Sequence, residues 1–411
     1  MKIKIKYFYL FIIATFAVIS CEDNNSVFDP DFELTGETPV INSITPSNRY
    51  LAGVDSVIIN GSFFSSNIEE NTVNFGGSPG VILQASENQL IVRPGFNTGD
   101  SILVRVSTRG TEFFNDDYYY RLDSAFTNVR GLDNNYRPLS ALAIDKDENL
   151  HGFINIAGTK AFYQITKSGV ISTYSPTTRF GTYTGAQFGP DDGLYLISTA
   201  SPNSAIFRMP SGGNAQGQQD GVWAFPPFSE KANFVDLAFD NNGYIWVIGN
   251  NTNIYRYTYS DKSLQRFPFT ANLRTAVVFN NQLFVAGSKD NIETVWKFDI
   301  SGSSLGAPSE VLRLENNTTS EINGVIRDIS FDSDGNLYLA IQNGNNSILK
   351  VEPNGRIYPF YRYVLEGSYY SLTWDEEGNM IGGILSGENG SLLLNKIDMF
   401  DKTRAPIYGI E

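Results

Sequence analysis

The stretch ISFDSDGNLYLAIQNGNNSILKVEPNGRIYPF occupies residues 329–360 and contains four short runs rich in apolar, β-branched and aromatic residues. Asp, Asn, Gly and Pro residues separate these runs, a pattern that predicts four consecutive strands. The first turn, DSDGN at residues 332–336, also resembles the start of a calcium-binding loop. The stretch is therefore a metal site, a cluster of catalytic carboxylates or one unit of a repeat.

Related sequences recur five more times along the chain, and the fourth of the six copies lacks the acidic residues of the turn. The other versions are LAIDKDENLHGFI from Leu142, AQFGPDDGLYLIS from Ala186, LAFDNNGYIWVIG from Leu237, AVVFNNQLFVAG from Ala276 and LTWDEEGNMIGGI from Leu372. Successive copies are 40 to 52 residues apart, and each continues into a further two-strand pattern. Four strands per unit in six units predict a six-bladed β-propeller over residues 123–411.

The form FDxDGNLYLA…ILKVxPNGRI is similar to NHL and gluconolactonase-like propeller repeats. On this interpretation Asp332, Asp334 and Gly335 form a hairpin turn between an inner strand and its neighbour. A calcium loop needs a longer run of oxygen ligands that ends in a bidentate Glu, and no copy has one. The segment around Ser124, DSAFTNVRG, is a candidate for the outer strand that closes the ring against the last blade.

Residues 39–122 predict a second, smaller β-domain. Short alternating runs separated by turn residues are typical of an antiparallel sandwich. The pieces PVINSITP from Pro39, VIINGSFF from Val57, VNFGG from Val73 and ILVRVST from Ile102 resemble the IPT/TIG family of immunoglobulin-like domains. The resemblance implies a spacer or interaction domain. The overall fold class is therefore all-β, an immunoglobulin-like sandwich followed by a propeller.

The N-terminus predicts export and a lipid anchor. Residues 1–20 combine three lysines with an apolar run and end in VIS before Cys21, the only cysteine, which looks like a bacterial lipobox. Lipidation of Cys21 would anchor the protein in the outer membrane, with residues 21–38 as a flexible tether. Glu22 and Asp23 are similar to the surface-export signal of Bacteroidetes lipoproteins, which implies exposure at the cell surface.

Charge and composition argue against several function classes. The net charge of −14 disfavours binding to nucleic acid, because phosphate backbones would be repelled. His151 is the only histidine and falls on a second strand of the repeat, away from the converging loops. This argues against a serine or cysteine triad and a histidine zinc site. We expect no cofactor.

A ligand site is expected where the loops that lead into the inner strands converge. The candidate ligand-binding residues are Arg137, Arg179, Arg274 and Arg327 with Tyr136, Tyr183, Phe228, Tyr361 and Tyr369. Aromatic faces stack on sugar rings and guanidinium groups bind hydroxyls or carboxylates, so a glycan, neutral or acidic, would fit. The alternative interpretation is that the cations pair with carboxylates such as Asp133 and Glu321 and that the aromatic residues fill the space between blades.

The leading functional hypothesis is a non-catalytic surface lipoprotein that binds a ligand, carbohydrate in the first place, with outer-membrane transporter proteins as further partners. A protein–protein interaction scaffold is the first alternative. The second is a calcium-dependent, lactonase-like propeller enzyme that would use channel residues such as Asp236, Asp328, Asn233 and Glu321. A glycosidase with a pair of channel carboxylates also stays open, because sequence alone does not fix their separation.

Overall fold

Strands make up nearly all of the regular structure in the computed structural model, which describes residues 34, 36–129, 136–156, 159–175, 183–198, 204–213, 221–226, 228–230, 232–314, 321–386, 391–400 and 402–405. Within these residues the helical elements are two single turns, η1 (Ile68–Glu70) and η2 (Phe228–Glu230). The prediction of an all-β chain is confirmed. The chain forms two compact units, the first built mainly from residues before Arg121 and the second mainly from those after it.

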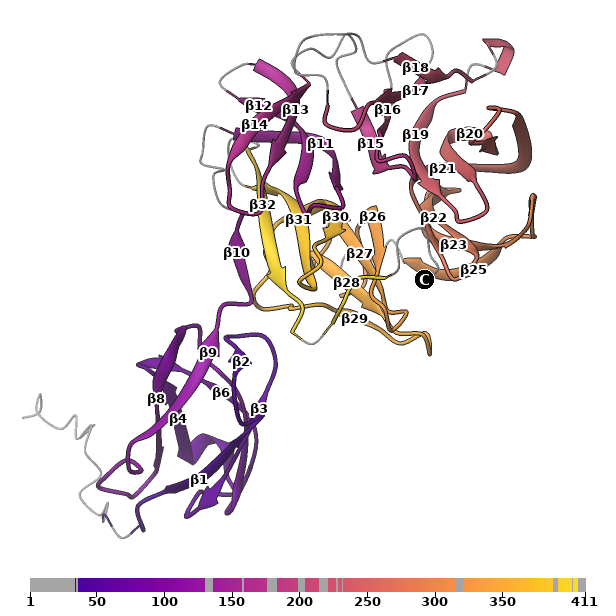
Figure 1. Ribbon diagram of the computed structural model, residues 1–411. Coiled ribbons are helices and arrows are strands. Elements are labelled where there is room, and N and C mark those ends of the chain that lie inside the picture. The colour runs from indigo at the N-terminus through magenta and orange to yellow at the C-terminus, as the bar shows by residue number, and fades with distance from the viewer. Residues whose placement is uncertain are drawn as a thin grey trace, which may run out of the picture. The chain divides into compact units, whose positions relative to one another are not determined.

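Residues 40–123 form two mainly antiparallel sheets (Figure 1). One has the order β1-β3-β7-β6, with β1 Val40–Thr45, β3 Val57–Ser62, β7 Gln89–Arg93 and β6 Val81–Ser86. The other has the order β2-β9-β8-β4-β5, with β2 Tyr50–Leu51, β9 Tyr118–Asp123, β8 Gly99–Thr108, β4 Asn71–Phe75 and β5 Ser78–Pro79. Every second residue of the central strands is buried, as Val57 and Ile59 show. This alternation gives each sheet one apolar face, as in a sandwich.

The second unit is a six-bladed propeller in which blades 1, 2, 5 and 6 are each a four-stranded antiparallel sheet. Blade 1 consists of β11 Tyr136–Ile144, β12 Leu150–Ile156, β13 Thr159–Ile165 and β14 Ile171–Ser175. Blade 2 consists of β15 Tyr183–Phe188, β16 Leu194–Ser198, β17 Ala205–Met209 and β18 Gly221–Ala224. Blade 5 consists of β26 Val325–Phe331, β27 Leu337–Gln342, β28 Ile348–Val351 and β29 Ile357–Pro359.

Blades 3 and 4 share one continuous sheet. It contains β19 Phe234–Phe239, β20 Tyr244–Thr258, β21 Leu264–Phe279, β22 Gln282–Lys289, β23 Ile292–Ser301, β24 Ser304–Leu305 and β25 Ser309–Leu314. The first part of β21 pairs with β20 as the outer strand of blade 3, and its last part pairs with β22 as the inner strand of blade 4. The single long strand β21 therefore belongs to both blades, and no loop separates blade 3 from blade 4.

Both ends of the second unit contribute to blade 6, which closes the ring. Its strands are β30 Ser368–Trp374, β31 Asn379–Ser386 and β32 Ser391–Asp398, and the outermost strand is β10 Phe126–Asn128. Phe126 pairs with Ile397 and Asn128 with Asn395, so the prediction for the segment around Ser124 is confirmed. Neighbouring inner strands contact each other in the order β11, β15, β19, β21, β26, β30 and back to β11 (Figure 1).

The aspartate of each acidic turn is a hydrogen-bond acceptor that fixes the hairpin. Asp332 is fully buried, and its Oδ1 accepts the N–H groups of Asp334 at 3.0 Å and Asn336 at 2.8 Å. Its Oδ2 accepts the hydroxyl of Tyr338, on the second strand, at 3.0 Å. Gly335 has φ +82°, a left-handed conformation that favours glycine. The turn of residues 332–336 is therefore structural, as the repeat predicts.

The same arrangement recurs with different donors in blades 1 and 3. Trp246 Nε1 donates to Asp240 Oδ2 at 2.9 Å, and His151 Nε2 lies 2.8 Å from Asp145 Oδ2. Burial alone would raise the pKa of Asp145, but hydrogen bonds from His151 and Asn149 outweigh it and lower the pKa to about 2. The single histidine thus serves the position that tyrosine or tryptophan fills elsewhere.

Replacing Asp332 by alanine should lower the free energy of unfolding by roughly 3 kcal/mol, because four accepted hydrogen bonds disappear and buried donors stay unpaired. Denaturant titration of the purified protein measures this change. The matched control is Asp334→Ala in the same turn, where the carboxylate is exposed and pairs with Lys402. Equal effects of the two substitutions would contradict the structural role of Asp332.

Candidate functional site

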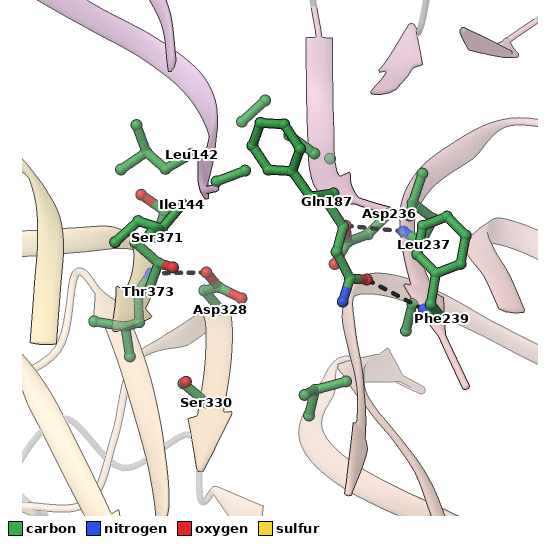
Figure 2. A pocket seen from close by; sticks show the side chains of 18 of the residues that line it. Leu142, Ile144, Gln187, Asp236, Leu237, Phe239, Asp328, Ser330, Ser371 and Thr373 are labelled. Carbon is green, nitrogen blue, oxygen red and sulfur yellow. Dashed lines mark hydrogen bonds between the residues drawn. The ribbon is translucent and has the colours of Figure 1, made fainter. Parts of the chain in front are cut away.

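The inner strands of the propeller surround a cavity of about 960 Å³, the channel. Its walls include residues from the inner strands of all six blades. Figure 2 shows Asp328 and Ser371 on one side of the channel and Gln187 and Asp236 on the other. A cavity of this size matches the range of small-molecule binding sites.

Each inner strand of blades 2 to 6 contains a β-bulge at the same position. One residue is left over in the pairing with the second strand, between Tyr183 and Gly185 in β15 and between Ile326 and Asp328 in β26. The corresponding irregularities lie in β19, β21 and β30. Bulges redirect side chains and are common beside functional sites. The bulged residues, all lining the channel, are Thr184, Val235, Arg274, Arg327 and Tyr370, and we refer to them as the first ring.

The residues that follow the bulges also line the channel and form a second ring. They are Gly185, Asp236, Thr275, Asp328 and Ser371. Because each inner strand runs from the converging loops toward the acidic turn, the first ring lies nearer the loops. Blade 1 departs from this pattern, with two irregularities in β11 and a left-handed Ala141.

The first ring is chemically one-sided. Blades 2 and 3 contribute Thr184 and Val235. The next three blades around the ring contribute Arg274, Arg327 and Tyr370. Arg327 lies with its guanidinium carbon 5.3 Å from the ring centre of Tyr370, in a cation–π contact. The wall of blades 4 to 6 therefore presents cationic and aromatic groups to the channel.

Arg274 is anchored by a carboxylate. Its Nη2 forms an ion pair with Glu293 on β23, and its Nε donates to the carbonyl oxygen of Ile326 at 2.8 Å. Glu293 also accepts the N–H of Ile326 at 3.1 Å. Since Glu293 is buried, this ion pair holds the inner strands of blades 4 and 5 together.

Arg327 has neutral partners instead. Its Nε donates to Oε1 of Gln342, and Nε2 of Gln342 donates to the hydroxyl of Tyr370 at 2.6 Å. The ion pairs among the described residues do not include Arg327. Burial, and then the charge of Arg274, lower the pKa of Arg327 below its ordinary value. Gln342 thus orients both a cation and an aromatic ring at the channel wall.

The carboxylates of the second ring link adjacent blades. Asp236 accepts the N–H of Ala276 at 2.9 Å from the next blade, and Asp328 accepts the hydroxyl of Thr275 at 2.6 Å and the N–H of Leu372 at 2.8 Å. A Cβ on Gly185 would lie only 2.4 Å from Oδ1 of Asp236, so this position requires glycine. The second ring therefore joins blades 3 to 6 around the channel.

Both carboxyl groups are difficult to ionise. Burial first, and then the charge of Asp328, raise the pKa of Asp236 to about 8 despite its backbone hydrogen bonds. Burial raises the pKa of Asp328 to about 6. These acceptors are already occupied by backbone and hydroxyl donors, which leaves few lone pairs for a cation. The described residues contain no group of three or more His, Cys, Asp or Glu that could hold a metal ion.

Of the nine predicted ligand-binding residues, two lie at the channel, Arg274 and Arg327. The prediction is wrong for Tyr183 and Tyr369, which are buried in the packing between blades with 1% and 0% of their surface exposed. Tyr361 is not among the residues that line the channel; its ring stacks on Phe360, with 3.9 Å between ring centres, and its hydroxyl donates to the carbonyl oxygen of Asp398. Tyr183 and Tyr369 occupy the position that the alternative interpretation gives to aromatic residues, the space between blades.

The side chains of the other predicted site residues lie outside the described part of the chain. Arg179 and Cys21 lie outside the described residues, and nothing is described of the side chains of Tyr136, Arg137 and Phe228. Among the carboxylates, Glu321 pairs with Arg362 and not with a channel arginine. Sequence reasoning missed Tyr370 and Gln342. Tyr370 could have been found from the repeat, because it directly precedes Ser371 just as Arg327 directly precedes Asp328 in the aligned inner strands.

Comparison with known proteins supports both parts of the fold. Residues 39–121 match the family model of the IPT/TIG domain, so the first unit is an IPT/TIG domain. No curated protein matches the chain by sequence.

Three solved structures show similarity over most of the chain. Auxiliary nutrient binding proteins from Bacteroides ovatus ATCC 8483 and Bacteroides thetaiotaomicron VPI-5482 are each 12% identical, with TM-scores of 0.52 and 0.53, and the match covers 89% of this chain and 99% of theirs. A candidate phosphatase from Bacteroides thetaiotaomicron VPI-5482 is 13% identical, with a TM-score of 0.53 over 89% of this chain and 98% of its own. At these identities the similarity shows a shared fold.

The stability of the protein should fall as the pH rises from about 4 to about 8. Asp236 and Asp328 have folded pKa values above the ordinary value near 4, so the folded state holds more protons than the unfolded state in this window. Each such group contributes up to about 1.4 kcal/mol per pH unit to the slope of the free energy of unfolding against pH.

Denaturant titrations at several pH values should show a smaller slope in Asp236→Asn. The control Asp299→Asn, at an exposed position of β23, should keep the wild-type slope, and an unchanged slope in Asp236→Asn would contradict the assignment.

Proposed function

We propose that this protein is a non-catalytic, cell-surface lipoprotein that binds carbohydrate in the propeller channel, with the IPT/TIG domain as a spacer. The observation that carries the proposal is the one-sided first ring, where Arg274, Arg327 and Tyr370 project from consecutive bulges into a cavity of about 960 Å³. Aromatic rings and guanidinium groups are common ligands of sugar rings and their substituents. The similar chains named auxiliary nutrient binding proteins support a binding role.

Hydroxyl and amide groups elsewhere on the wall suit the same ligand class. Gln187, Ser330, Ser371 and Thr373 line the channel and carry groups that both donate and accept hydrogen bonds (Figure 2). A sugar offers the complementary pattern of hydroxyl groups on an apolar ring. The mixture of polar and apolar walls therefore favours a carbohydrate over a purely apolar molecule.

The channel gives the enzyme alternatives less support. A calcium-dependent lactonase would need channel carboxylates that are free to coordinate the metal, yet Asp236 and Asp328 accept hydrogen bonds from backbone N–H groups of two blades. A pair of catalytic carboxylates would face the same competition. The observed hydrogen bonds assign these groups to holding the ring together.

A protein–protein scaffold remains the second candidate because of the first unit. Large aromatic side chains on the IPT/TIG domain are exposed to solvent, among them Phe96, Phe113 and Tyr119, each with more than half of its surface accessible. Exposed aromatic residues are frequent in protein interfaces. Such a surface is compatible with a carbohydrate-binding propeller and would join it to a transporter in the outer membrane.

Blocking the channel should abolish glycan binding. Val235→Trp places a large side chain in the first ring on the side away from the arginines, where the cavity leaves room for it. On a polysaccharide array or in affinity gels, the wild-type protein should be retained by at least one polysaccharide and Val235→Trp should lose at least tenfold in affinity. The control Val170→Trp, at an exposed turn of blade 1, should bind like wild type. Retention of no polysaccharide by the wild-type protein would refute the proposal.

The lipid anchor has its own test. Among the described residues no helix is long and apolar enough to span a membrane. If Cys21 carries the lipid, Cys21→Ser should lose palmitate labelling and move from the membrane fraction to the soluble fraction when expressed in a Gram-negative host. Protease treatment of intact cells should degrade the wild-type protein if it faces outward. Palmitate labelling that persists in Cys21→Ser would contradict the assignment.

A further inference from the structure

We propose that the channel selects a ligand that carries an anionic group, a carboxylate or sulfate on a sugar ring, and that Arg327 is the residue that binds this group. The inference rests on the proposed function and deepens it by naming the ligand class. It follows from the charges around the first ring, from the geometry of Arg327, and from the position of the second ring.

The charges of the two arginines are balanced differently. Arg274 forms its ion pair with Glu293, so this pair has no net charge. Arg327 contacts the amide of Gln342 and the ring of Tyr370, both neutral, and belongs to no ion pair in the described part of the chain. At the level of the first ring, the wall of blades 4 to 6 therefore carries one positive charge that belongs to no ion pair among the described residues, in a protein whose net charge is −14.

A partly buried cation without an ion-pair partner is unfavourable, because burial removes water from it. The charge of Arg274 adds repulsion, and the charge of Glu293 opposes that repulsion. An anionic ligand bound to Arg327 would offset the cost of burial. A neutral sugar would not, so the difference in free energy between the two ligands supplies selectivity.

The geometry of Arg327 leaves its guanidinium edge for a ligand. The hydrogen bond to Gln342 uses Nε, and the guanidinium carbon lies 5.3 Å from the ring centre of Tyr370. The two Nη groups of the guanidinium can each donate a hydrogen bond to one oxygen of a carboxylate or sulfate. Gln342 is a positioning residue here, since its amide holds Arg327 with one atom and Tyr370 with the other.

The second ring limits how deep the anionic group can enter. Asp236 and Asp328 line the channel just beyond the first ring. Asp328, with a pKa of about 6, is ionised at neutral pH and would repel a second anion. The anionic substituent is therefore confined to the level of Arg327, and the neutral part of the sugar faces the remaining wall. Blades 2 and 3 leave space for it, because their first-ring residues are Thr184 and Val235.

The test compares ligands that differ in charge alone. Isothermal titration calorimetry would use trigalacturonate, its methyl ester, a sulfated galactose oligomer and a set of neutral oligosaccharides. We expect an acidic oligomer to bind at least tenfold more tightly than its neutral counterpart, and the affinity to fall as the salt concentration rises. Preference for trigalacturonate or for the sulfated oligomer identifies which anionic group is the natural one. Equal affinity for the acid and its ester, with no preference for the sulfated oligomer, would overturn the inference.

Variants of Arg327 separate charge from folding. Arg327→Gln should weaken binding of the acidic oligomer roughly 10- to 100-fold, and binding of a neutral oligomer by a much smaller factor. Arg327→Lys keeps the charge and should recover part of the loss. The matched control is Arg313→Gln, an exposed arginine on the outer strand β25 of blade 4, which should bind like wild type.

The two proposals fail in different ways. If neutral oligosaccharides bind as tightly as acidic ones, both lose affinity in Val235→Trp, and Arg327→Gln does not weaken the acidic ligand more than the neutral one, the carbohydrate function stands and the anionic ligand is refuted. If no oligosaccharide binds, both are refuted. Thermal unfolding of each variant shows whether a loss of binding comes from a loss of fold.

Discussion

The pairing of β10 with β32 is the constraint on which the propeller depends. Three residues from the start of the second unit, Phe126–Asn128, complete the blade whose other strands lie at its end. This pairing converts a row of sheets into a ring, because it joins the first strand of the second unit to its last strand. Closure brings β30 against β11 and creates the channel that β11, β15, β19, β21, β26 and β30 enclose. The side chains of the site face each other only because the ring is closed.

Two sets of hydrogen bonds hold this ring, one inside each blade and one between blades. Within a blade, the turn aspartate accepts backbone N–H groups and a donor from the second strand, as Asp332 does from Tyr338. Between blades, Asp236 and Asp328 accept donors across the channel wall. These carboxylates thus act as hydrogen-bond acceptors that hold the ring together. This explains why an acidic channel need not be a catalytic or metal site.

Functional differences arise where blades depart from the common pattern. Five inner strands share a bulge, and the bulged side chain is free to vary because it points into the channel and does not pack between blades. Small or apolar residues occupy this position in blades 2 and 3, and Arg274, Arg327 and Tyr370 occupy it in blades 4 to 6. One repeated backbone feature therefore carries an asymmetric set of side chains. Such asymmetry is what a ring of similar blades needs in order to bind one face of a small ligand.

The sequence by itself determined the all-β fold, the repeat and the turn role of Asp332, because turn chemistry and strand periodicity are local properties of the chain. It offered the segment around Ser124 only as a candidate for the closing strand, and it singled out Arg274 and Arg327. It also placed Tyr183 and Tyr369 at the site, since an aromatic residue near a loop has the same sequence signature whether it faces a ligand or an adjacent blade. Only the tertiary structure revealed the bulges, the partnership of Arg274 with Glu293, and the neutral hydrogen-bond partner of Arg327. These features depend on which strands lie side by side after closure, and residues far apart in the chain decide that.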